Sequence, residues 1–343
     1  MIKTLDVDDF LSKISDNILL IDARSEAEFL QGNIPGSINI PLLNNEQRIV
    51  IGTIYKQKGR EVAVKKGFEL IGPHFYQKFE QIAELAIDKK VMIYCWRGGM
   101  RSGILSWMMS LANYEVFTLK GGYKSFRKKV LEINSSNYTF IVVGGKTGCG
   151  KTKCLQLLKA KNEQIIDLEN LANHRGSAFG QNENSCQPSN ENFENLLAFE
   201  LLKCNHQQKI WIENESRLIG KIKIPDNLYN QLKSSFLIEL KIEKRERVKR
   251  IIDEYVKTDT SNLIASTKKI ERKLGNQRMR EAIEALESKD YNTWVNFILH
   301  YYDQTYTYGL NKRNGKKIEA DFDWSNAEKS INNLLKLTAE NEY

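Results

Sequence analysis

Hydrophobic and polar positions along this chain of 343 residues form two series of short apolar runs that meet near residue 135. In the first series, NILLIDAR, KVMIYCW and YEVFTLKGG each end in turn or loop residues. Between them, PHFYQKFEQIAELAIDKK places Phe75, Phe79, Ile82 and Ala86 at helical spacing. Strands that alternate with helices predict an α/β domain with a parallel sheet over residues 1–133.

The second series begins after EINSSN (residues 132–137), a polar segment that we interpret as a linker. YTFIVVGG, KIWIENES and SSFLIELKI have the pattern of strands in a second α/β sheet. From about residue 245 onward the pattern is helical and strongly charged. We therefore predict a second α/β domain over residues 138–343, with a helical and basic C-terminal region.

Composition narrows the class of protein. A hydrophobic content of 41% and a charged content of 27% are typical of a soluble globular protein. The sequence contains no apolar run of about 18 residues, and its start lacks the pattern of a signal peptide. The five cysteines form no CxxC pair, which argues against a disulfide framework and a zinc ribbon. These features favour a cytoplasmic protein with reduced thiols and no membrane contact.

The segment VMIYCWRGGMRSG (residues 91–103) joins the end of a predicted strand to the start of a predicted helix. Backbone N–H groups in such a glycine-rich turn form an anion-binding nest, which also stabilises a thiolate. Cys95 is therefore a candidate nucleophile, and the alternative is a free cysteine in the core. The candidate residues of the anion-binding loop are Trp96, Arg97, Gly98, Gly99, Met100 and Arg101.

The segment IVVGGKTGCGKTKCL contains a second candidate anion site. Its pattern is G-x-x-x-x-G-K-[ST], with an apolar strand before it and a helical stretch after it. The backbone would hold a di- or triphosphate, Lys151 would neutralise it, and the Thr152 hydroxyl would reach Mg²⁺. The alternative is a glycine-rich turn without a ligand. The candidate phosphate-binding residues are Gly145, Gly148, Gly150, Lys151 and Thr152.

Several charged residues are candidates to support the phosphate loop. Asp167, Glu213 and Glu215 follow predicted strands, so each is a candidate acidic partner for a metal. His174 and Arg175 lie in DLENLANHRGSAFG, where they are candidates to hold a pyrophosphate or a substrate oxygen. The alternative for this segment is an ordinary surface loop.

The first domain resembles the rhodanese family. The resemblance rests on the Cys95 loop, on IDARSEAEFLQGNIPGSINIP (residues 21–41) and on VFTLKGGY (residues 116–123). It implies a rhodanese fold with Cys95 as a candidate chalcogen carrier. The common sulfurtransferase loop has four residues between cysteine and arginine, whereas residues 96–100 make five here, similar to the cell-cycle phosphatases of this fold. The longer loop predicts room for a phosphate or for a group bulkier than one sulfur atom.

The combination of this domain with a phosphate loop, DLENLANHRGSAFG, WIENESRLIG and HYYDQTYTYG resembles the tRNA 2-selenouridine synthase family. The resemblance implies a transferase that converts wobble 2-thiouridine of tRNA to 2-selenouridine, by S-geranylation with geranyl diphosphate and then selenation with selenophosphate. It implies that Cys95 serves the selenation step, as a selenium carrier or as a nucleophile. The loop of residues 98–101 would hold selenophosphate, and the loop of residues 145–152 would hold the prenyl diphosphate or a nucleotide such as ATP or GTP.

Charge indicates where tRNA would bind. The net charge is +8, which fits either a polyanionic partner or a solvated basic surface. Two basic clusters, residues 241–250 and 268–280, favour tRNA contacts in the C-terminal half. We expect Trp96 to stack on a flipped base, and the aromatic residues of HYYDQTYTYG to pack in a core. An enzyme that produces selenophosphate is a further candidate partner.

Two other functions fit parts of the pattern. One is a bifunctional enzyme with a phosphatase-like loop and a small-molecule kinase domain. The other is a non-catalytic nucleotide sensor with a regulatory rhodanese domain. Inactive copies usually lose a reactive residue, so the presence of Cys95, Lys151 and Thr152 argues against the sensor.

Overall fold

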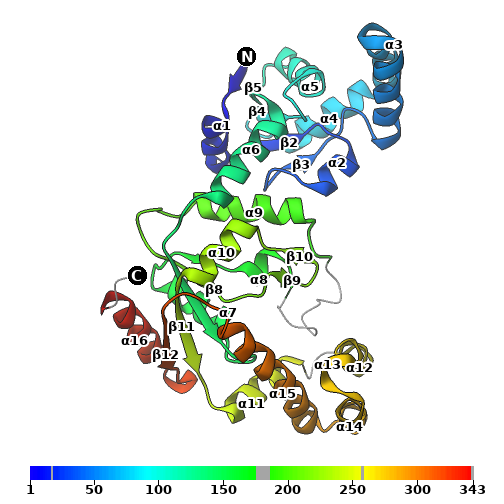
Figure 1. Cartoon of the computed structure of the whole chain (residues 1–343). Helices are drawn as coiled ribbons and strands as arrows, with labels where there is room; N and C mark the ends of the chain where they lie inside the picture. The colour runs from blue at the N-terminus through cyan, green and yellow to red at the C-terminus, as the bar shows by residue number, and fades with distance from the viewer. Residues whose placement is uncertain (17, 175–185, 256–258, 341–343) are drawn as a thin grey trace. The chain divides into compact units, whose positions relative to one another are not determined.

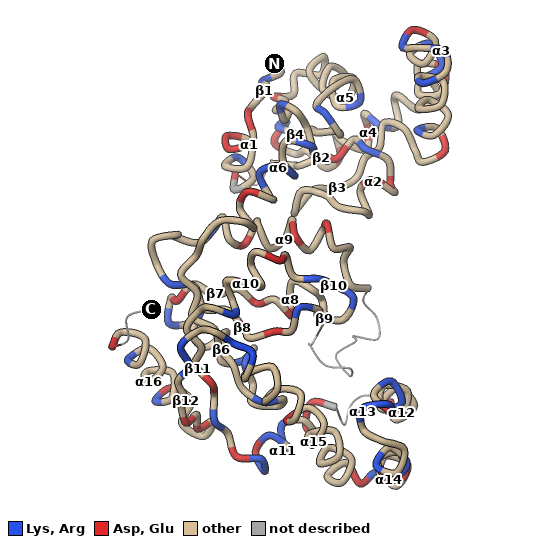
Figure 2. Tube along the Cα trace, viewed as in Figure 1, with Lys and Arg blue, Asp and Glu red and all other residues tan. Residues whose placement is uncertain are grey.

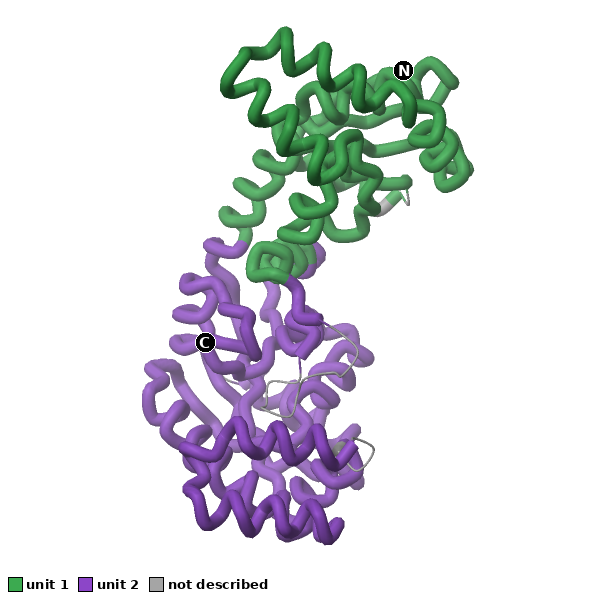
Figure 3. Tube along the Cα trace, turned by 90° about the vertical axis from the view of Figure 1, so that its right-hand side faces the viewer, with its two compact units in different colours: residues 1–133, 189–199 green, residues 134–188, 200–343 purple. Residues whose placement is uncertain are grey.

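The computed structural model describes residues 1–16, 18–174, 186–255 and 259–340 (Figure 1). The chain separates into two compact units, which Figure 3 colours green and purple. Unit 1 contains residues 1–133 together with residues 189–199, and unit 2 contains residues 134–188 and 200–343. Because each unit has its own parallel sheet, the α/β fold class predicted from the sequence is confirmed.

Unit 1 is built on a five-stranded parallel sheet with the order β1-β5-β4-β2-β3. Its strands are β1 (Ile2–Leu5), β2 (Leu19–Asp22), β3 (Ile38–Asn39), β4 (Lys90–Tyr94) and β5 (Glu115–Leu119). Its helices are α1 (Val7–Lys13), η1 (Ile14–Asp16), α2 (Glu26–Gln31), α3 (Asn45–Ile71), η2 (Gly72–His74), α4 (Phe75–Leu85), α5 (Met100–Leu111) and α6 (Gly122–Ser135). The central strand β4 is almost entirely buried, so the residues that follow it begin from the core of the unit.

Helix α3 is interrupted by Gly59, whose φ of 82° and ψ of −179° are not helical. A Cβ atom at Gly67 would lie 4.0 Å from the side chain of Ile51. In an unbroken helix these two positions would be about 24 Å apart. The chain therefore turns back at Gly59, and the two arms of α3 pack against each other as a helical hairpin, which the sequence pattern did not predict.

The segment of residues 189–199 lies between strands of unit 2 in the sequence but packs in unit 1. It forms most of helix α9 (Asn190–Leu202). The Asn195 amide donates to the backbone oxygen of Asn33 over 2.8 Å, and Glu194 forms an ion pair of 2.5 Å with Arg127. These contacts tie α9 to the α6 side of the unit 1 sheet.

Unit 2 is built on a second parallel sheet, with the order β12-β11-β6-β8-β7. Its strands are β6 (Phe140–Gly145), β7 (Ile165–Ile166), β8 (Ile210–Glu213), β11 (Phe236–Lys241) and β12 (Lys317–Asp321), beside a small hairpin of β9 (Leu218–Ile219) and β10 (Ile222–Lys223). Its helices are α7 (Lys151–Ala160), α8 (Leu168–Leu171), α10 (Asp226–Ser234), α11 (Lys244–Tyr255), α12 (Thr260–Lys269), α13 (Glu271–Leu274), α14 (Asn276–Glu287), α15 (Tyr291–Leu310), η3 (Trp324–Asn326) and α16 (Ala327–Glu340). Strands β6 and β8 are neighbours, so their carboxyl ends meet at one edge of the sheet.

The helical C-terminal region has an apolar core of its own. Residues of α11 to α15 bury a cluster that includes Leu263, Leu286, Trp294 and Leu299. Helices α11 and α15 also contact each other, so the cluster joins them within the helical region. Among the helices described, none is long and apolar enough to cross a membrane.

The close approach of Gly122 to the Cys95 loop generates a stability prediction. A Cβ atom at Gly122 would lie 2.2 Å from the Cys95 backbone oxygen, and its φ is +60°. Gly122→Ala should therefore lower the free energy of unfolding of unit 1 by about 2–4 kcal/mol, measured by urea unfolding.

Gly36→Ala is the matched control. Gly36 has a φ of +83°, but nothing lies within 4 Å of its Cβ position. This variant should lose only about 1 kcal/mol, from the backbone conformation alone. Equal losses in the two variants would contradict the role of the close approach.

Candidate active sites in the two units

Cys95 of unit 1 directly follows β4 and precedes the first turn of α5. Its side chain is buried, and its Sγ lies 3.2 Å from the Ser102 hydroxyl, so the first turn of α5 contacts the sulfur. The loop residues between them are exposed, including Trp96, Arg97 and Met100. The thiol therefore lies beneath an exposed loop whose backbone begins a helix.

The Cys95 loop packs against the turn after β5. The Tyr123 N–H donates to the Cys95 backbone oxygen over 2.8 Å, and the Lys124 N–H donates to that of Trp96 over 3.0 Å. A Cβ atom at Gly98 would lie 2.5 Å from the Leu119 oxygen, and its φ is +64°. Glycine is required at Gly98 and Gly122 because the two loops approach each other through their backbones.

Arg101 has a partner within unit 1. Its guanidinium forms an ion pair with Glu28, with a shortest distance of 2.5 Å. Burial disfavours the charged form of Glu28, but hydrogen bonding and attraction from Arg101 outweigh it and hold the pKa of Glu28 below its ordinary value. An anion in the loop would therefore share Arg101 with Glu28, while Arg97 stays exposed.

A buried cation lies under the aromatic residues of the same site. Arg24 bonds Asp22, and its guanidinium lies 3.7 Å from the centre of the Tyr123 ring. The Trp96 ring lies 5.8 Å from the Tyr123 ring and is 39% exposed. The stack of Arg24, Tyr123 and Trp96 therefore ends in an indole that a base or another planar group could reach.

The phosphate loop of unit 2 runs from the end of β6 to the start of α7. Gly148 and Gly150 have φ values of +81° and +84°, and Gly150 directly precedes the helix. A Cβ atom at Gly150 would lie 2.4 Å from the Arg250 guanidinium and 2.7 Å from the Trp324 ring, so these two side chains pack against the loop at Gly150. Because the loop leads directly into α7, its backbone N–H groups lie at the N-terminus of that helix, where an anion is stabilised.

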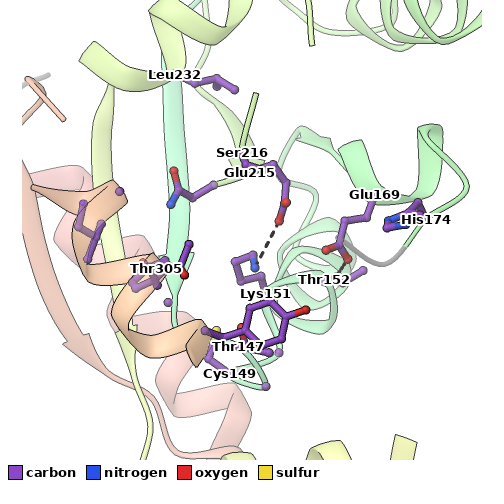
Figure 4. Close-up of a pocket in the computed structure, with 18 of the residues that line it drawn as sticks. Thr147, Cys149, Lys151, Thr152, Glu169, His174, Glu215, Ser216, Leu232 and Thr305 are labelled. Atoms are coloured by element: carbon purple, nitrogen blue, oxygen red, sulfur yellow. Dashed lines mark hydrogen bonds and ion pairs between the residues drawn. The ribbon is translucent and has the colours of Figure 1, made fainter. Parts of the chain in front are cut away.

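Three carboxylates lie near Lys151: Glu169 in α8, Glu213 at the end of β8 and Glu215 just after it, of which Figure 4 shows Glu169 and Glu215. The Lys151 ammonium lies 3.4 Å from Glu215, and the Thr152 hydroxyl donates to Glu169 over 3.2 Å. Glu213 accepts a hydrogen bond of 2.7 Å from the Glu169 N–H. One cation therefore stands against three acidic groups in a buried setting.

The pKa values of these groups follow from that imbalance. Burial and the nearby Glu215 raise the pKa of Glu169 to about 7. Burial, followed by Glu169 and Glu215, raises the pKa of Glu213 well above its ordinary value. Burial alone would lower the pKa of Lys151, but Glu215 and its neighbours outweigh burial and raise it. The site therefore holds a charged ammonium and resists full ionisation of its carboxylates.

The carboxylates of Glu169, Glu213 and Glu215 fit a divalent cation. One oxygen from each lies within 4.8 Å of the others. Among the described residues no donor reaches Oε2 of Glu213, although this atom is buried. Hard oxygen donors beside the Thr152 hydroxyl are the donor set that Mg²⁺ takes next to a phosphate.

The phosphate loop opens into a cavity of about 1160 Å³ within unit 2. Its lining includes Lys151, Glu169, Glu215 and His174. It also includes aromatic and aliphatic side chains together with further cations: Tyr229, Leu232, Ile251, Ile270, Tyr301, Tyr302, Tyr306, Tyr308 and Leu310, with Lys233, Lys273, Lys312 and Arg313. A ligand that joins phosphate groups to an apolar body fits this mixture of charged and apolar lining.

Two family models match the chain, and the boundary between their matches lies close to the boundary between the two units. The model of the tRNA 2-selenouridine synthase AAA domain matches residues 138–336, and the rhodanese-like domain model matches residues 6–129. The chain is 33% identical to a tRNA 2-selenouridine synthase of Sulfurovum sp. (strain NBC37-1), over 90% of this chain and 93% of the relative. The relative of that name from Hydrogenovibrio crunogenus (strain DSM 25203 / XCL-2) is also 33% identical, over 90% and 94%.

The chain belongs to the tRNA 2-selenouridine synthase family. The resemblance inferred from the sequence is thereby confirmed. Among solved structures, the N-terminal domain of a candidate ATP/GTP binding protein from Clostridium difficile 630 is 36% identical, with a TM-score of 0.36. It covers 38% of this chain and 99% of its own length.

The surroundings of the phosphate loop in this chain include a carboxylate that was not among the residues singled out from the sequence. Glu169 was not among the candidate site residues, although it lies two positions after Asp167 at the end of β7. Asp167 itself caps α8, since its side chain accepts from the Asn170 N–H over 2.9 Å. His174 lines the cavity, where burial lowers its pKa, and Arg175 lies outside the described residues.

The tyrosines of HYYDQTYTYG were expected to pack in a core, and this is confirmed for Tyr301 and Tyr302, which pack against the apolar cluster of α11 to α15. In addition, Tyr301, Tyr302, Tyr306 and Tyr308 line the cavity, which the sequence pattern did not predict. They reach it because α15 runs past the phosphate loop, where Asp303 of the same helix pairs with Arg247 over 2.8 Å. Helical spacing placed these residues on a helix, but only packing decides which face of α15 meets the loop.

The first basic cluster is only partly available to a polyanion. Figure 2 shows Lys and Arg on α11 to α14, with acidic residues interspersed. Arg247 is buried and donates to the Thr147 backbone oxygen over 3.1 Å. The Arg250 guanidinium lies 4.0 Å from the centre of the Trp324 ring. These two arginines therefore belong to the walls of the phosphate loop, while Lys244, Arg245 and Lys249 stay exposed.

The raised pKa values generate a prediction for stability in metal-free buffer. Between about pH 4.5 and pH 7 the folded protein holds a proton on Glu169 that the unfolded chain has lost. Since the folded state then binds more protons, the free energy of unfolding should fall as pH rises through this window, by on the order of 2 kcal/mol. Glu213 should extend the fall to higher pH.

Glu213→Gln should make that fall shallower, because the amide keeps an acceptor for the Glu169 N–H but has no proton to lose. The measurement is urea unfolding in EDTA at several pH values between about 5 and 8. Glu328→Gln is the control, since Glu328 is exposed and pairs with Lys161. An unchanged pH dependence in Glu213→Gln would contradict the assignment.

Proposed function

We propose that this protein converts wobble 2-thiouridine in tRNA to 2-selenouridine in two steps. In the first step, unit 2 transfers a geranyl group from geranyl diphosphate to the sulfur. In the second step, unit 1 replaces the geranylthio group with selenium from selenophosphate. Family membership supports the overall reaction, and the geometry of the two sites supports the division between the units.

The cavity of unit 2 is the observation that supports assigning geranyl transfer, the first step, to this unit. Its lining combines the glycine-rich loop, which would bind a diphosphate, with tyrosine and aliphatic side chains and further cations. Geranyl diphosphate has a charged end and an apolar end, and this mixed lining would accommodate both. A nucleoside triphosphate would use the same N–H cradle, so the cradle alone does not distinguish the two ligands. The apolar part of the lining favours the prenyl donor.

In the first step the thiocarbonyl sulfur attacks C1 of the donor, the C1–O bond breaks and diphosphate leaves. The N–H groups of the phosphate loop and the Lys151 ammonium would stabilise the charge that develops on diphosphate. The side chains of Thr152, Glu169, Glu213 and Glu215 would hold Mg²⁺, which supplies further neutralisation of the leaving group. The N3 proton of the base leaves to solvent or to a basic side chain.

In the second step selenophosphate and water yield phosphate and hydrogen selenide, which replaces the geranylthio group at C2. The products are 2-selenouridine and geranylthiol, which carries the second proton. The selenium of selenide and the sulfur of a thiolate are both fully reduced. Forming a sulfur–selenium bond between them, as in a perselenide on Cys95, would therefore require a two-electron oxidant. A nucleophilic Cys95 needs none: its thiolate attacks C2, geranylthiol leaves, and selenide then displaces the enzyme sulfur.

The test is to incubate the protein with 2-thiouridine tRNA and geranyl diphosphate, with and without selenophosphate, and to weigh the nucleosides after digestion. Cys95→Ala should form the geranylated nucleoside but no 2-selenouridine. Lys151→Ala should slow geranylation at least about 100-fold, because it removes the charge beside the leaving group. Cys186→Ala and Lys159→Ala, both exposed positions, are the matched controls and should retain both steps.

Unchanged 2-thiouridine with the wild-type protein would contradict the proposed function. Phosphate release from ATP or from a phosphoester in the same tubes would then support the alternative of a kinase-like and phosphatase-like enzyme. Loss of geranylation in Cys95→Ala would contradict the division of the two steps between the units.

A further inference from the structure

Unit 1 contains a pocket of about 590 Å³ that has no part in the steps proposed above for Cys95. It lies between the two arms of α3 and the first turn of α5. Aliphatic and aromatic side chains dominate its walls, including Leu42, Ile49, Ile51, Phe68, Ile71 and Ile104. Its volume is in the range of pockets that bind small organic molecules.

The pocket begins where the Cys95 loop ends. Met100 and Arg101 line it, and they are the last residues of the loop and the first of α5. The next residue, Ser102, lies 3.2 Å from the Cys95 sulfur through its hydroxyl. The same helical turn therefore contacts the thiol with one residue and the apolar pocket with its neighbours.

The apolar walls are left open. Ile49 is 61% exposed and Phe68 is 60% exposed, although both line a concave surface. The hairpin that carries them exists because Gly59 lets α3 fold back on itself. Large apolar side chains gathered around an open pocket indicate a binding site, because exposing so much apolar surface to water is unfavourable unless a ligand covers it.

Cations accompany the apolar walls. Arg48, Lys56, Arg60 and Arg101 all line the pocket. Arg48 and Arg101 share Glu28, so the four cations outnumber the carboxylate that faces them. This combination fits an apolar group that is attached to a polyanion.

We propose that this pocket binds the prenyl chain of S-geranylated tRNA while the geranylthio group is exchanged at Cys95. The inference rests on the proposed function and adds a binding site for its intermediate. Selenophosphate has no apolar part, so it does not account for the walls. Free geranyl diphosphate would bring a diphosphate, for which unit 2 offers the glycine-rich cradle.

A prenyl pocket beside the thiol would have two effects. It would place C2 of the base near Cys95 by holding the group that is about to leave. It would also favour geranylated over unmodified 2-thiouridine tRNA, so that exchange follows alkylation. The pocket would act on binding of the intermediate and leave the chemistry of unit 2 unchanged.

The test uses the full chain with Ile49→Ser and Phe68→Ser, which remove apolar surface at exposed positions without adding charge. With pre-formed S-geranyl-2-thiouridine tRNA and selenophosphate, KM for the tRNA should rise about 10-fold, with a smaller change in kcat. Without selenophosphate, the preference in binding affinity for geranylated over 2-thiouridine tRNA should fall by a similar factor. The rate of geranylation from geranyl diphosphate should stay within about 2-fold of the wild type.

Ile87→Ser is the matched control, since Ile87 is 89% exposed in unit 1 and does not line the pocket. It should leave KM and the binding preference unchanged. Wild-type values in both pocket variants would overturn the inference, as would an equal loss of affinity for both tRNAs. Failure of the wild-type protein to convert geranylated tRNA would instead overturn the proposed function.

Discussion

The charge balance around Lys151 is the interaction on which unit 2 depends. One buried ammonium faces Glu169, Glu213 and Glu215, which the parallel order of β7, β8 and β6 brings to one edge of the sheet. Three carboxylates cannot all ionise there without more positive charge, so protons or a divalent cation complete the balance. The glycine loop adds its N–H groups at the same point. Together they form a site that is ready for a cation and a phosphate at once.

Unit 1 depends on a steric constraint of the same kind. The Cys95 loop and the turn after β5 meet backbone to backbone, and only glycine at Gly98 and Gly122 permits this approach. The contact holds the loop over the thiol, and α5 packs on the sheet directly after the loop. Both units therefore carry a glycine-rich loop after a buried central strand, β4 or β6, with a cavity next to it.

The path of the chain links the two units in a way that their motifs do not reveal. Helix α9 lies between the strands of unit 2 in the sequence, yet its first part bonds Asn33, Tyr123 and Arg127 of unit 1. Tyr123 also lies over Arg24 and beside Trp96, so a segment that is distant in sequence supports the Cys95 site. Domain boundaries drawn at residues 133 and 138 follow the apolar pattern, which carries no information about this exchange.

The sequence by itself determined the fold class, the position of the two glycine-rich loops and the family, because strands, glycine turns and the residues Cys95, Lys151 and Thr152 are set by local spacing. The sequence offered Asp167, Glu213 and Glu215 as candidate acidic partners. Tertiary structure decided that Glu169 joins Glu213 and Glu215 while Asp167 caps α8, since Glu169 and Glu213 meet through the pairing of β7 with β8. It also decided that α15 turns its tyrosines toward the phosphate loop and that α3 folds back at Gly59 to form a pocket. The physical reason is that periodicity records how a segment buries its own face, whereas cavities and charge clusters arise from the side chains of several segments that meet.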